Sequence, residues 1–208
     1  TLSHHGEVKQ CLKTSLKTVD MKQICHIGVT DSTPAFINAN KTYDSQLTII
    51  RAAKHFYNEF DAILHVGGEK FSLSRFNADH QYSGAKYNTS CAAGTGSFLD
   101  QQARRLNLFG GSKELSQKAN FNSKKIPDIA TRCSVFAKTD LIHAQQEGYG
   151  IEQICDGLCY GLAKNISNTL FKYNQVGEKI LFCGGVSHNK SVIHHLEKIT
   201  HYRFIIDT

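Results

Sequence analysis

CAAGTGSFLDQQARRL, the stretch from Cys91 to Leu106, places a thiol and a Gly-Thr-Gly turn directly before a helix pattern. Apolar side chains recur in it at helical spacing, at Phe98, Leu99, Ala103 and Leu106. Glycine lets a ligand approach the backbone closely, and the first N–H groups of a helix attract negative charge. The stretch therefore predicts an amphipathic helix whose first turn suits an anion or a metal cluster.

A second helix opens on a thiol in the same way, at Cys133. In the run SVFAKTDLIHAQQEG that follows, Val135, Phe136 and Ile142 mark one apolar side of a helix that we expect to end at Gly148. An iron or iron–sulfur site takes about four thiolates, so two cysteines are too few to hold one. A symmetric dimer would supply the other two.

Helix and strand patterns alternate along the rest of the chain, which predicts an α/β fold. We expect helices at residues 7–19, 44–59, 151–173 and 190–199, the second capped by Asp44 or Ser45. We expect strands at residues 23–29, 61–66, 71–76, 82–88, 179–183 and 202–206. The strands at 61–66 and 71–76 flank Gly67-Gly68 and form a hairpin. Gly110-Gly111 and residues 120–125 are predicted loops.

The composition is that of a globular protein with a substantial core. The chain has 208 residues, 40% of them hydrophobic and 20% charged. It shows no long apolar run and no signal-peptide pattern, so we expect no membrane association. Seven cysteines without disulfide-scaffold spacing indicate a reducing compartment, and we expect the cytoplasm. The net charge of +6 is scattered rather than gathered in a basic stripe, so we expect no nucleic-acid partner.

The remaining cysteines and the histidines fit packing roles better than metal binding. Cys11, Cys25 and Cys183 lie in apolar contexts and are predicted core residues. Cys155 and Cys159 stand one helical turn apart, which fits either a small-residue packing face or two ligands on one side of a helix. The adjacent pairs His4-His5 and His194-His195 diverge, so we expect no histidine metal site.

Three segments together resemble the BadF/BadG/BcrA/BcrD-type ATPases, which are activators of 2-hydroxyacyl-CoA dehydratases and components of benzoyl-CoA reductase. They are CAAGTGSFLDQQARRL, CSVFAKTDLI and ILFCGGVSHNKSV, they occur in the family's order, and the similarity is clearest from Ile63 to Asn189. The resemblance implies an actin-like ATPase fold, which is ribonuclease H-like, with a mixed sheet and flanking helices. Two phrases, HHGEVKQCL and CSVFAKTDLIHAQQEG, look more like the large, multidomain members.

The resemblance also implies cofactors and partners. It implies ATP or ADP with Mg²⁺, and one [4Fe-4S] cluster shared across a homodimer with two cysteines from each subunit. ATP turnover would then drive a low-potential electron to an electron-accepting dehydratase or reductase. Charge moving in the nucleotide cleft would tilt the helices that bear the cluster.

Site residues carry over from the family motif by motif. The implied nucleotide-binding residues are Gly67, Gly68, Gly94, Thr95, Gly96, Gly184, Gly185 and Asn189. The implied cluster ligands are Cys91 and Cys133, which without a cluster would be inert loop thiols. A glycine turn presents N–H groups to phosphates, although Gly184-Gly185 also fits an ordinary strand-to-helix turn. Asn189 fits either a helix cap or a nucleotide contact.

The hairpin turn departs from the family pattern. The family has Asp-Ile-Gly-Gly-Gln-Asp where this chain has His65-Val66-Gly67-Gly68-Glu69-Lys70. His65 replaces the carboxylate expected to organise Mg²⁺ or water, and Lys70 replaces the second acid. Phosphate binding survives such changes, whereas efficient hydrolysis is not expected, and no catalytic base stands out.

The chain also lacks the first phosphate hairpin of an actin-like ATPase. No Asp-x-Gly-Ser/Thr turn between two strands precedes Gly67, and the segment from Gly28 to Thr33 has no hairpin partner. We therefore interpret the chain as a fragment, with residues 1–60 the remainder of a first lobe and residues 61–208 a second lobe. Two alternatives are a non-redox nucleotide-binding regulatory module and an N-acetylhexosamine kinase-like protein. A kinase would need an acidic base, which the phosphate turn at His65 does not offer.

Overall fold

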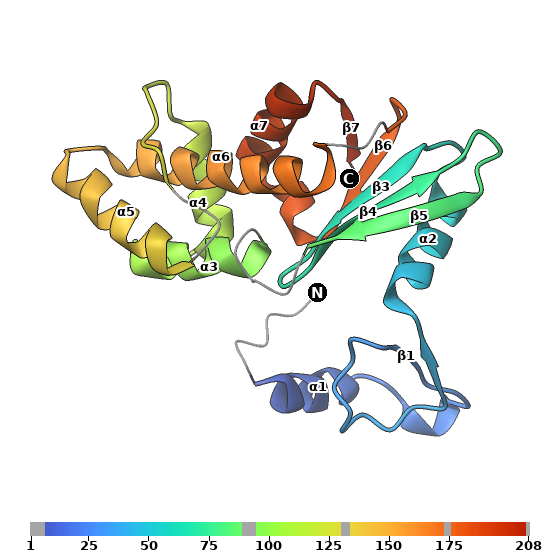
Figure 1. Cartoon of the computed structure of the whole chain (residues 1–208). Helices are drawn as coiled ribbons and strands as arrows, with labels where there is room; N and C mark the ends of the chain where they lie inside the picture. Colours follow the sequence, from blue (N-terminus) through green and yellow to red (C-terminus); the bar gives the residue numbers. More distant parts are fainter. Residues whose placement is uncertain (1–6, 89–94, 130–133, 173–175, 207–208) are drawn as a thin grey trace. The chain divides into compact units, whose positions relative to one another are not determined.

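The computed structural model describes residues 7–88, 95–129, 134–172 and 176–206. The chain forms two compact units, Thr1–His55 and Phe56–Thr208 (Figure 1). Cys91, Gly94 and Cys133, three of the candidate site residues, lie outside the described residues. None of the described helices is long and apolar enough to cross a membrane.

The first unit is built from short elements. It contains α1 (Val8–Leu16), the 3-10 turn η1 (Met21–Gln23), β1 (Gly28–Thr30), β2 (Lys41–Tyr43) and α2 (Ser45–Phe56). β1 and β2 pair in parallel. Asp44 caps α2 as predicted, since its Oδ1 accepts a hydrogen bond from the Leu47 N–H at 2.8 Å.

Two predictions for this unit are wrong. Most of the strand expected at residues 23–29 is a loop, at residues 24–27, that follows the 3-10 turn η1, and only Gly28–Thr30 is extended. β2, which the sequence reading missed, offers β1 just three partner residues, so a longer strand has nothing to pair with. Cys25 is consequently exposed rather than in a core, and Cys11 is half-buried.

The second unit contains a mixed sheet of five strands. They are β3 (Ala62–Val66), β4 (Phe71–Phe76), β5 (Tyr82–Tyr87), β6 (Ile180–Cys183) and β7 (Phe204–Ile206), in the spatial order β5-β4-β3-β6-β7. β3 pairs antiparallel with β4 and parallel with β6. The predicted hairpin is thereby confirmed. Because β3 is central, nearly all of its side chains are buried on both faces.

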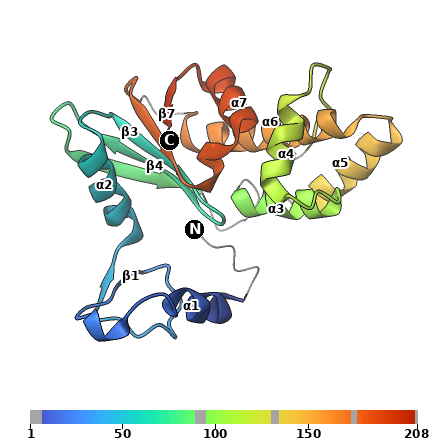
Figure 2. The ribbon, with the colours of Figure 1, turned by 180° about the vertical axis from the view of Figure 1, so that it is seen from behind.

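In the described part of this unit, five helices and one 3-10 turn accompany the sheet. They are α3 (Gly96–Arg105), α4 (Gly111–Asn120), α5 (Ser134–Gln146), α6 (Ile151–Leu170), the 3-10 turn η2 (Gly185–His188) and α7 (Lys190–Thr200). α6 is the longest helix and packs against both α4 and α7. In Figures 1 and 2, α3, α4 and α5 gather around the N-terminal half of α6, whereas the strands lie toward its C-terminal end.

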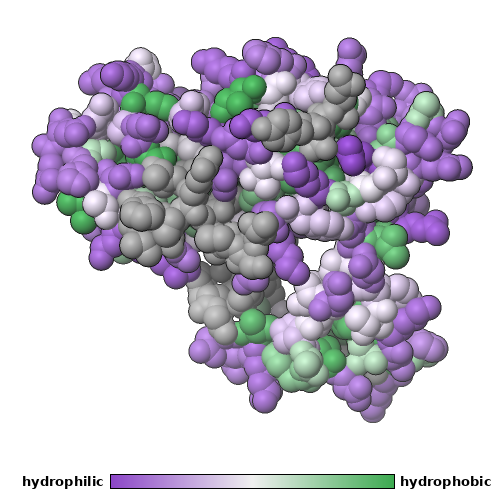
Figure 3. Space-filling model, in the orientation of Figure 1, coloured by the Kyte–Doolittle hydropathy of each residue, from purple (hydrophilic) through white to green (hydrophobic). Residues whose placement is uncertain are grey.

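The core of the second unit lies between the sheet and these helices. α6 contributes Leu158, Leu162 and Ile166, all fully buried, and α7 contributes Val192 and Leu196. On the face shown in Figure 3, hydrophilic residues dominate and the hydrophobic ones form small separate patches. Most of the large apolar residues of β3, β4 and α6 are buried in the core rather than exposed.

Two helix assignments need correction. α4 occupies a stretch with few apolar residues, GSKELSQKAN, and the sequence reading gave no helix there; its buried side includes Leu115 and Ser116. Among the α5 side chains that the structure describes, Ala137, Leu141 and Ala144 are buried, while the predicted Ile142 is 45% exposed. The side chains of Val135 and Phe136, also predicted on the apolar side, lie outside those described. Each helix buries one leucine, and its other described buried residues are small or polar, which a search for a stripe of large apolar side chains does not detect.

Candidate functional site

Two segments far apart in the sequence meet at the carboxyl end of β3. The hairpin turn Gly67-Gly68 receives two hydrogen bonds from the first turn of α3, from the Gly96 N–H to the Gly67 carbonyl and from the Ser97 N–H to the Gly68 carbonyl, each at 2.9 Å. A Cβ on Gly96 would lie 3.1 Å from the Gly67 oxygen and 3.3 Å from Val186 Cγ2. Glycine at this position therefore lets α3 approach both the hairpin and η2.

The turn after β6 reaches the same edge. β6 runs parallel to β3 with His65 opposite Cys183, so the two strands end side by side. Gly184 has φ +94°, and a Cβ on it would collide with the Val66 carbonyl. Only glycine fits such a backbone so close to a neighbouring strand.

The glycines of these turns differ in what surrounds them. Gly96 and Gly184 are packed against neighbouring chain, as described above. In the described part of the chain, a Cβ on Gly68 or Gly185 would meet no atom within 4 Å. Two glycine turns thus present open backbone around one end of the sheet, while the other two glycines bring the segments together. This arrangement can admit a ligand that needs close approach to the main chain.

His65 lies between the two turns. Its Cε1 would be 3.3 Å from a Cβ on Gly67, and its Cδ2 would be 3.1 Å from a Cβ on Gly184. Burial lowers the pKa of the His65 imidazole, because desolvation disfavours the charged form. A neutral ring therefore stands at the position where the resemblance described above implied a carboxylate. With Lys70 exposed on the hairpin turn, these side chains do not fit a hard, carboxylate-rich Mg²⁺ site.

Thr95 and Asn189 occupy buried positions beside the turns. Thr95 is fully buried and precedes α3 in an extended conformation, with its Oγ1 3.2 Å from Ser97 Oγ. Asn189 caps α7, since its Oδ1 accepts from the Val192 N–H at 3.1 Å. The structure gives Asn189 the capping role that its position after η2 suggested.

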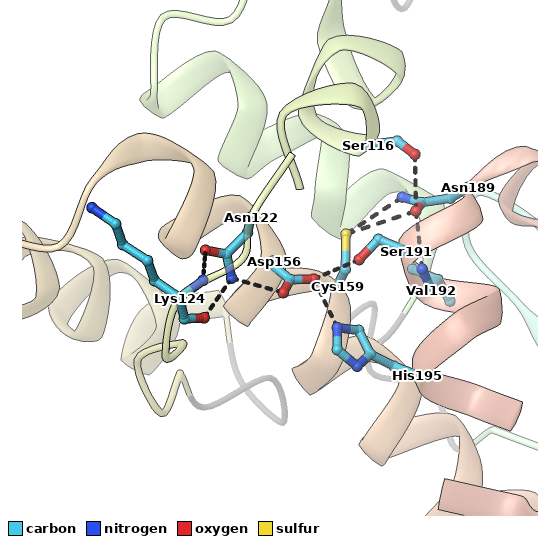
Figure 4. A network of polar contacts seen from close by, with 9 residues as sticks. All are labelled: Ser116, Asn122, Lys124, Asp156, Cys159, Asn189, Ser191, Val192 and His195. Carbon is cyan, nitrogen blue, oxygen red and sulfur yellow. Dashed lines mark hydrogen bonds and ion pairs between the residues drawn. The ribbon is translucent and has the colours of Figure 1, made fainter. Parts of the chain in front are cut away.

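The Asn189 side chain is also the centre of a buried polar cluster (Figure 4). Its Oδ1 accepts from Ser116 Oγ of α4 at 3.0 Å, and its Nδ2 lies 3.6 Å from Cys159 Sγ of α6. One side chain thereby joins the end of η2 to both helices.

The buried cysteines of α6 are packing residues. Burial raises the pKa of the Cys155 and Cys159 thiols to about 12 each, so both stay protonated near neutral pH. Cys183, expected in the core, is half-buried at the end of β6. Among the described residues, no three His, Cys, Asp or Glu side chains gather as a metal site would require.

A second polar cluster, which sequence reasoning missed, surrounds Asp156 on α6 (Figure 4). Its Oδ1 accepts from Ser191 Oγ and from His195 Nε2, both at 2.7 Å. Its Oδ2 accepts from Asn122 Nδ2 at 3.0 Å. Burial raises the pKa of the Asp156 carboxyl, but the hydrogen bonds from His195, Asn122 and Ser191 outweigh it and lower that pKa overall. The sequence signal here was the His194-His195 pair, in which His195 bonds Asp156 while His194 is exposed and the two ring centroids lie 5.7 Å apart.

Comparisons with known proteins agree with this architecture. A sequence model described as the BadF/BadG/BcrA/BcrD ATPase family matches residues 6–206. The chain is similar to the 2-hydroxyisocaproyl-CoA dehydratase activator of Clostridioides difficile, with 27% identity over 181 residues, which are 87% of this chain and 66% of the relative. It is also similar to a benzoyl-CoA reductase component of Thauera aromatica, with 25% identity over 182 residues, 87% of this chain and 62% of the relative.

A solved structure shares the fold. The activator of the 2-hydroxyisocaproyl-CoA dehydratase from Clostridium difficile, with bound ADPNP, matches with a TM-score of 0.83 and 21% identity, covering 100% of this chain and 76% of that chain. This likeness confirms the actin-like ATPase fold with a mixed sheet and flanking helices. The chain spans less than two thirds of the length of the two curated relatives, at 66% and 62%.

Proposed function

This chain belongs to the BadF/BadG/BcrA/BcrD ATPase family, and we propose that it is the nucleotide-binding part of an activator that delivers a low-potential electron to a dehydratase- or reductase-type partner. The observation that carries the proposal is the meeting of Gly67-Gly68, Gly96 and Gly184-Gly185 at one end of the sheet. The relatives named as a dehydratase activator and as part of benzoyl-CoA reductase support the class of partner. In this proposal residues 1–60 belong to a first lobe and residues 61–208 form the second.

The nucleotide is proposed to bind with its phosphates at the hairpin turn and its nucleoside at the turn after β6. The hairpin turn offers open backbone at Gly68, where main-chain N–H groups can face phosphate. Gly185 leaves room for the flat face of a base or for a sugar. The neutral His65 adds no charge to this site, so ATP is held without an acid that would orient water for hydrolysis.

The cluster is proposed to bind to Cys91 and Cys133 of two subunits. In the sequence, Cys133 directly precedes α5 and Cys91 comes a few residues before α3. The N-terminal end of a helix favours negative charge, which is why we propose these two thiolates as ligands. A two-fold dimer supplies the four thiolates that a [4Fe-4S] centre takes. When bound, the cluster would supply one-electron chemistry at low potential, and the chain would provide its ligands and exclude water.

Two measurements on the anaerobically purified protein test the proposal. Iron and sulfide analysis should give about four irons per dimer. Isothermal calorimetry should show ADP binding. ADP binding without iron would instead favour a non-redox nucleotide-binding module. His65 and Lys70, which replace the expected acids, favour this alternative because they disfavour ATP hydrolysis. Iron without nucleotide binding would refute the assignment of the glycine turns.

A further inference from the structure

The Asp156 cluster links the proposed nucleotide turn to a segment on the other side of α6. α7 begins directly after that turn, through η2 and the Asn189 cap. Asp156 holds α7 at Ser191 and His195, which lie one helical turn apart on the same face. A displacement of the turn after β6 therefore displaces two of the donors of Asp156.

The third donor of Asp156 belongs to the segment 122–129, which leads from α4 toward Cys133. The Asn122 side chain also organises the start of this segment, because its Nδ2 donates to the Lys124 carbonyl at 2.9 Å and its Oδ1 accepts from the Lys124 N–H at 3.0 Å. Figure 4 shows Asn122 and His195 approaching the same carboxylate from different sides.

Two further contacts fasten this segment to α6. Gln153 Nε2 donates to the Lys125 carbonyl at 2.6 Å. A Cβ on Gly157 would lie 3.0 Å from the Pro127 carbonyl oxygen, so glycine there lets the segment lie close against the helix. Ile129 is 4% exposed at the end of the described stretch. The segment 122–129 thus follows α6 on both sides of Asp156.

The Asp156 carboxylate makes these two attachments depend on each other. Its side chain is 14% exposed and that of His195 is 12% exposed, so little water can replace a lost donor. An ionised carboxylate out of water needs its hydrogen bonds, and losing one donor leaves charge unsatisfied. The position of α7 and the position of the segment are therefore coupled through one group.

We infer that Asp156 is a positioning residue that transmits occupancy of the Gly184-Gly185 turn to the segment 122–129, and so to the chain that enters Cys133. The inference rests on the proposed function, because it requires a nucleotide at that turn. It adds a specific route: turn, α7, Asp156, Asn122. The route is short, and each of its polar contacts is a hydrogen bond between described side chains.

Hydrogen exchange on the full chain, with and without ADP, tests this route. In the wild type, ADP should slow exchange of the amides in residues 123–129 by about tenfold. In Asp156→Asn the same ADP should change it by less than about twofold, and ADP should bind more weakly by up to the same tenfold factor, because coupling is reciprocal. Glu152→Gln is the matched control, a carboxylate on α6 one turn earlier that makes none of these hydrogen bonds.

Should Asp156→Asn fail to fold, Asn122→Ala cuts the route on one side of Asp156, and Ser191→Ala weakens it on the other, where His195 still donates to the carboxylate. Asn122→Ala should abolish the ADP-dependent protection and Ser191→Ala should reduce it, and the double variant should show no further loss than Asn122→Ala alone, because the two changes lie on one connection. A purely structural cluster would lower the melting temperature of each variant and leave the ADP-dependent difference intact, which overturns the inference. ADP that binds wild type without protecting residues 123–129 also overturns it, whereas absence of ADP binding refutes the nucleotide site itself.

Discussion

Substitutions at the two adjacent glycines after β6 should have opposite effects. Gly185→Val places its side chain in space where the described residues put no atom within 4 Å of the Cβ, so the fold should tolerate it. If that space receives the nucleotide, the added methyl groups overpack the site at a cost of about 1–3 kcal/mol. This cost corresponds to roughly 5- to 150-fold weaker ADP binding with a nearly unchanged melting temperature.

Gly184→Ala should instead unfold the protein more easily. Gly184 has φ +94° and ψ 169°, a region that costs a non-glycine residue about 1–3 kcal/mol. The collision of its Cβ with the Val66 carbonyl adds a further cost of about 1–3 kcal/mol from overpacking. A total of about 2–6 kcal/mol lowers the melting temperature of a chain of this length by roughly 4–24 °C.

Calorimetric titration with ADP and a thermal melt of each variant separate the two effects. Gly185→Ala serves as an intermediate control, since it adds a single carbon. Wild-type ADP affinity in Gly185→Val would show that the turn is only a strand-to-helix connection. A wild-type melt in Gly184→Ala would show that the close approach of β3 and this turn does not exist in solution.

Other outcomes follow from the cysteines, the hairpin and the buried imidazole. Cys91→Ser and Cys133→Ser should each remove the brown chromophore and loosen the dimer, whereas Cys155→Ser and Cys159→Ser should do neither. Visible absorption measures the chromophore and gel filtration measures the dimer. Iron that stays bound in the Cys91→Ser and Cys133→Ser variants would refute the proposed cluster ligands. ATP hydrolysis by this chain, measured as phosphate release, should stay far below about 1 per second. A rate at or above that value would show that His65 in place of an acid does not prevent hydrolysis. The pKa of His65 is lowered by folding, so the unfolded chain binds more protons, and stability should fall as pH drops below about 6.5. His65→Gln should remove this part of the pH dependence in denaturant melts between about pH 5 and 7, and an unchanged slope would place the imidazole in water.

The sequence predicted the local elements of the sheet well because their patterns are local. Phe71–Phe76 alternates strictly and forms β4 over the predicted residues. The Gly67-Gly68 turn between two apolar runs predicted the hairpin, and α3 buries Phe98, Leu99 and Ala103 as its periodicity indicated. Each of these segments buries one side and exposes the other, so its apolar periodicity can be recognised without knowing which segment packs against it.

The missed features depend on partners far away in the chain. α4 buries Ser116 because Asn189, 73 residues later, accepts its hydrogen bond. Asp156 is buried because its donors arrive from α7 and from the segment after α4, and no periodicity marks a hydrogen bond across 35 residues. The strand expected at residues 23–29 failed for the converse reason, since its apolar residues find only a short β2 to pair with.

The parallel pairing of β3 with β6 also bears on the order of folding. β3, β4 and β5 follow one another as hairpins and can pair soon after they are made. Ala62, by contrast, meets Ile180 only when the chain between them has closed a long loop. The Gly67-Gly68 and Gly184-Gly185 turns therefore come together late, after most of the unit has been synthesised. Recovery of ADP binding during refolding would then report completion of the sheet rather than its beginning.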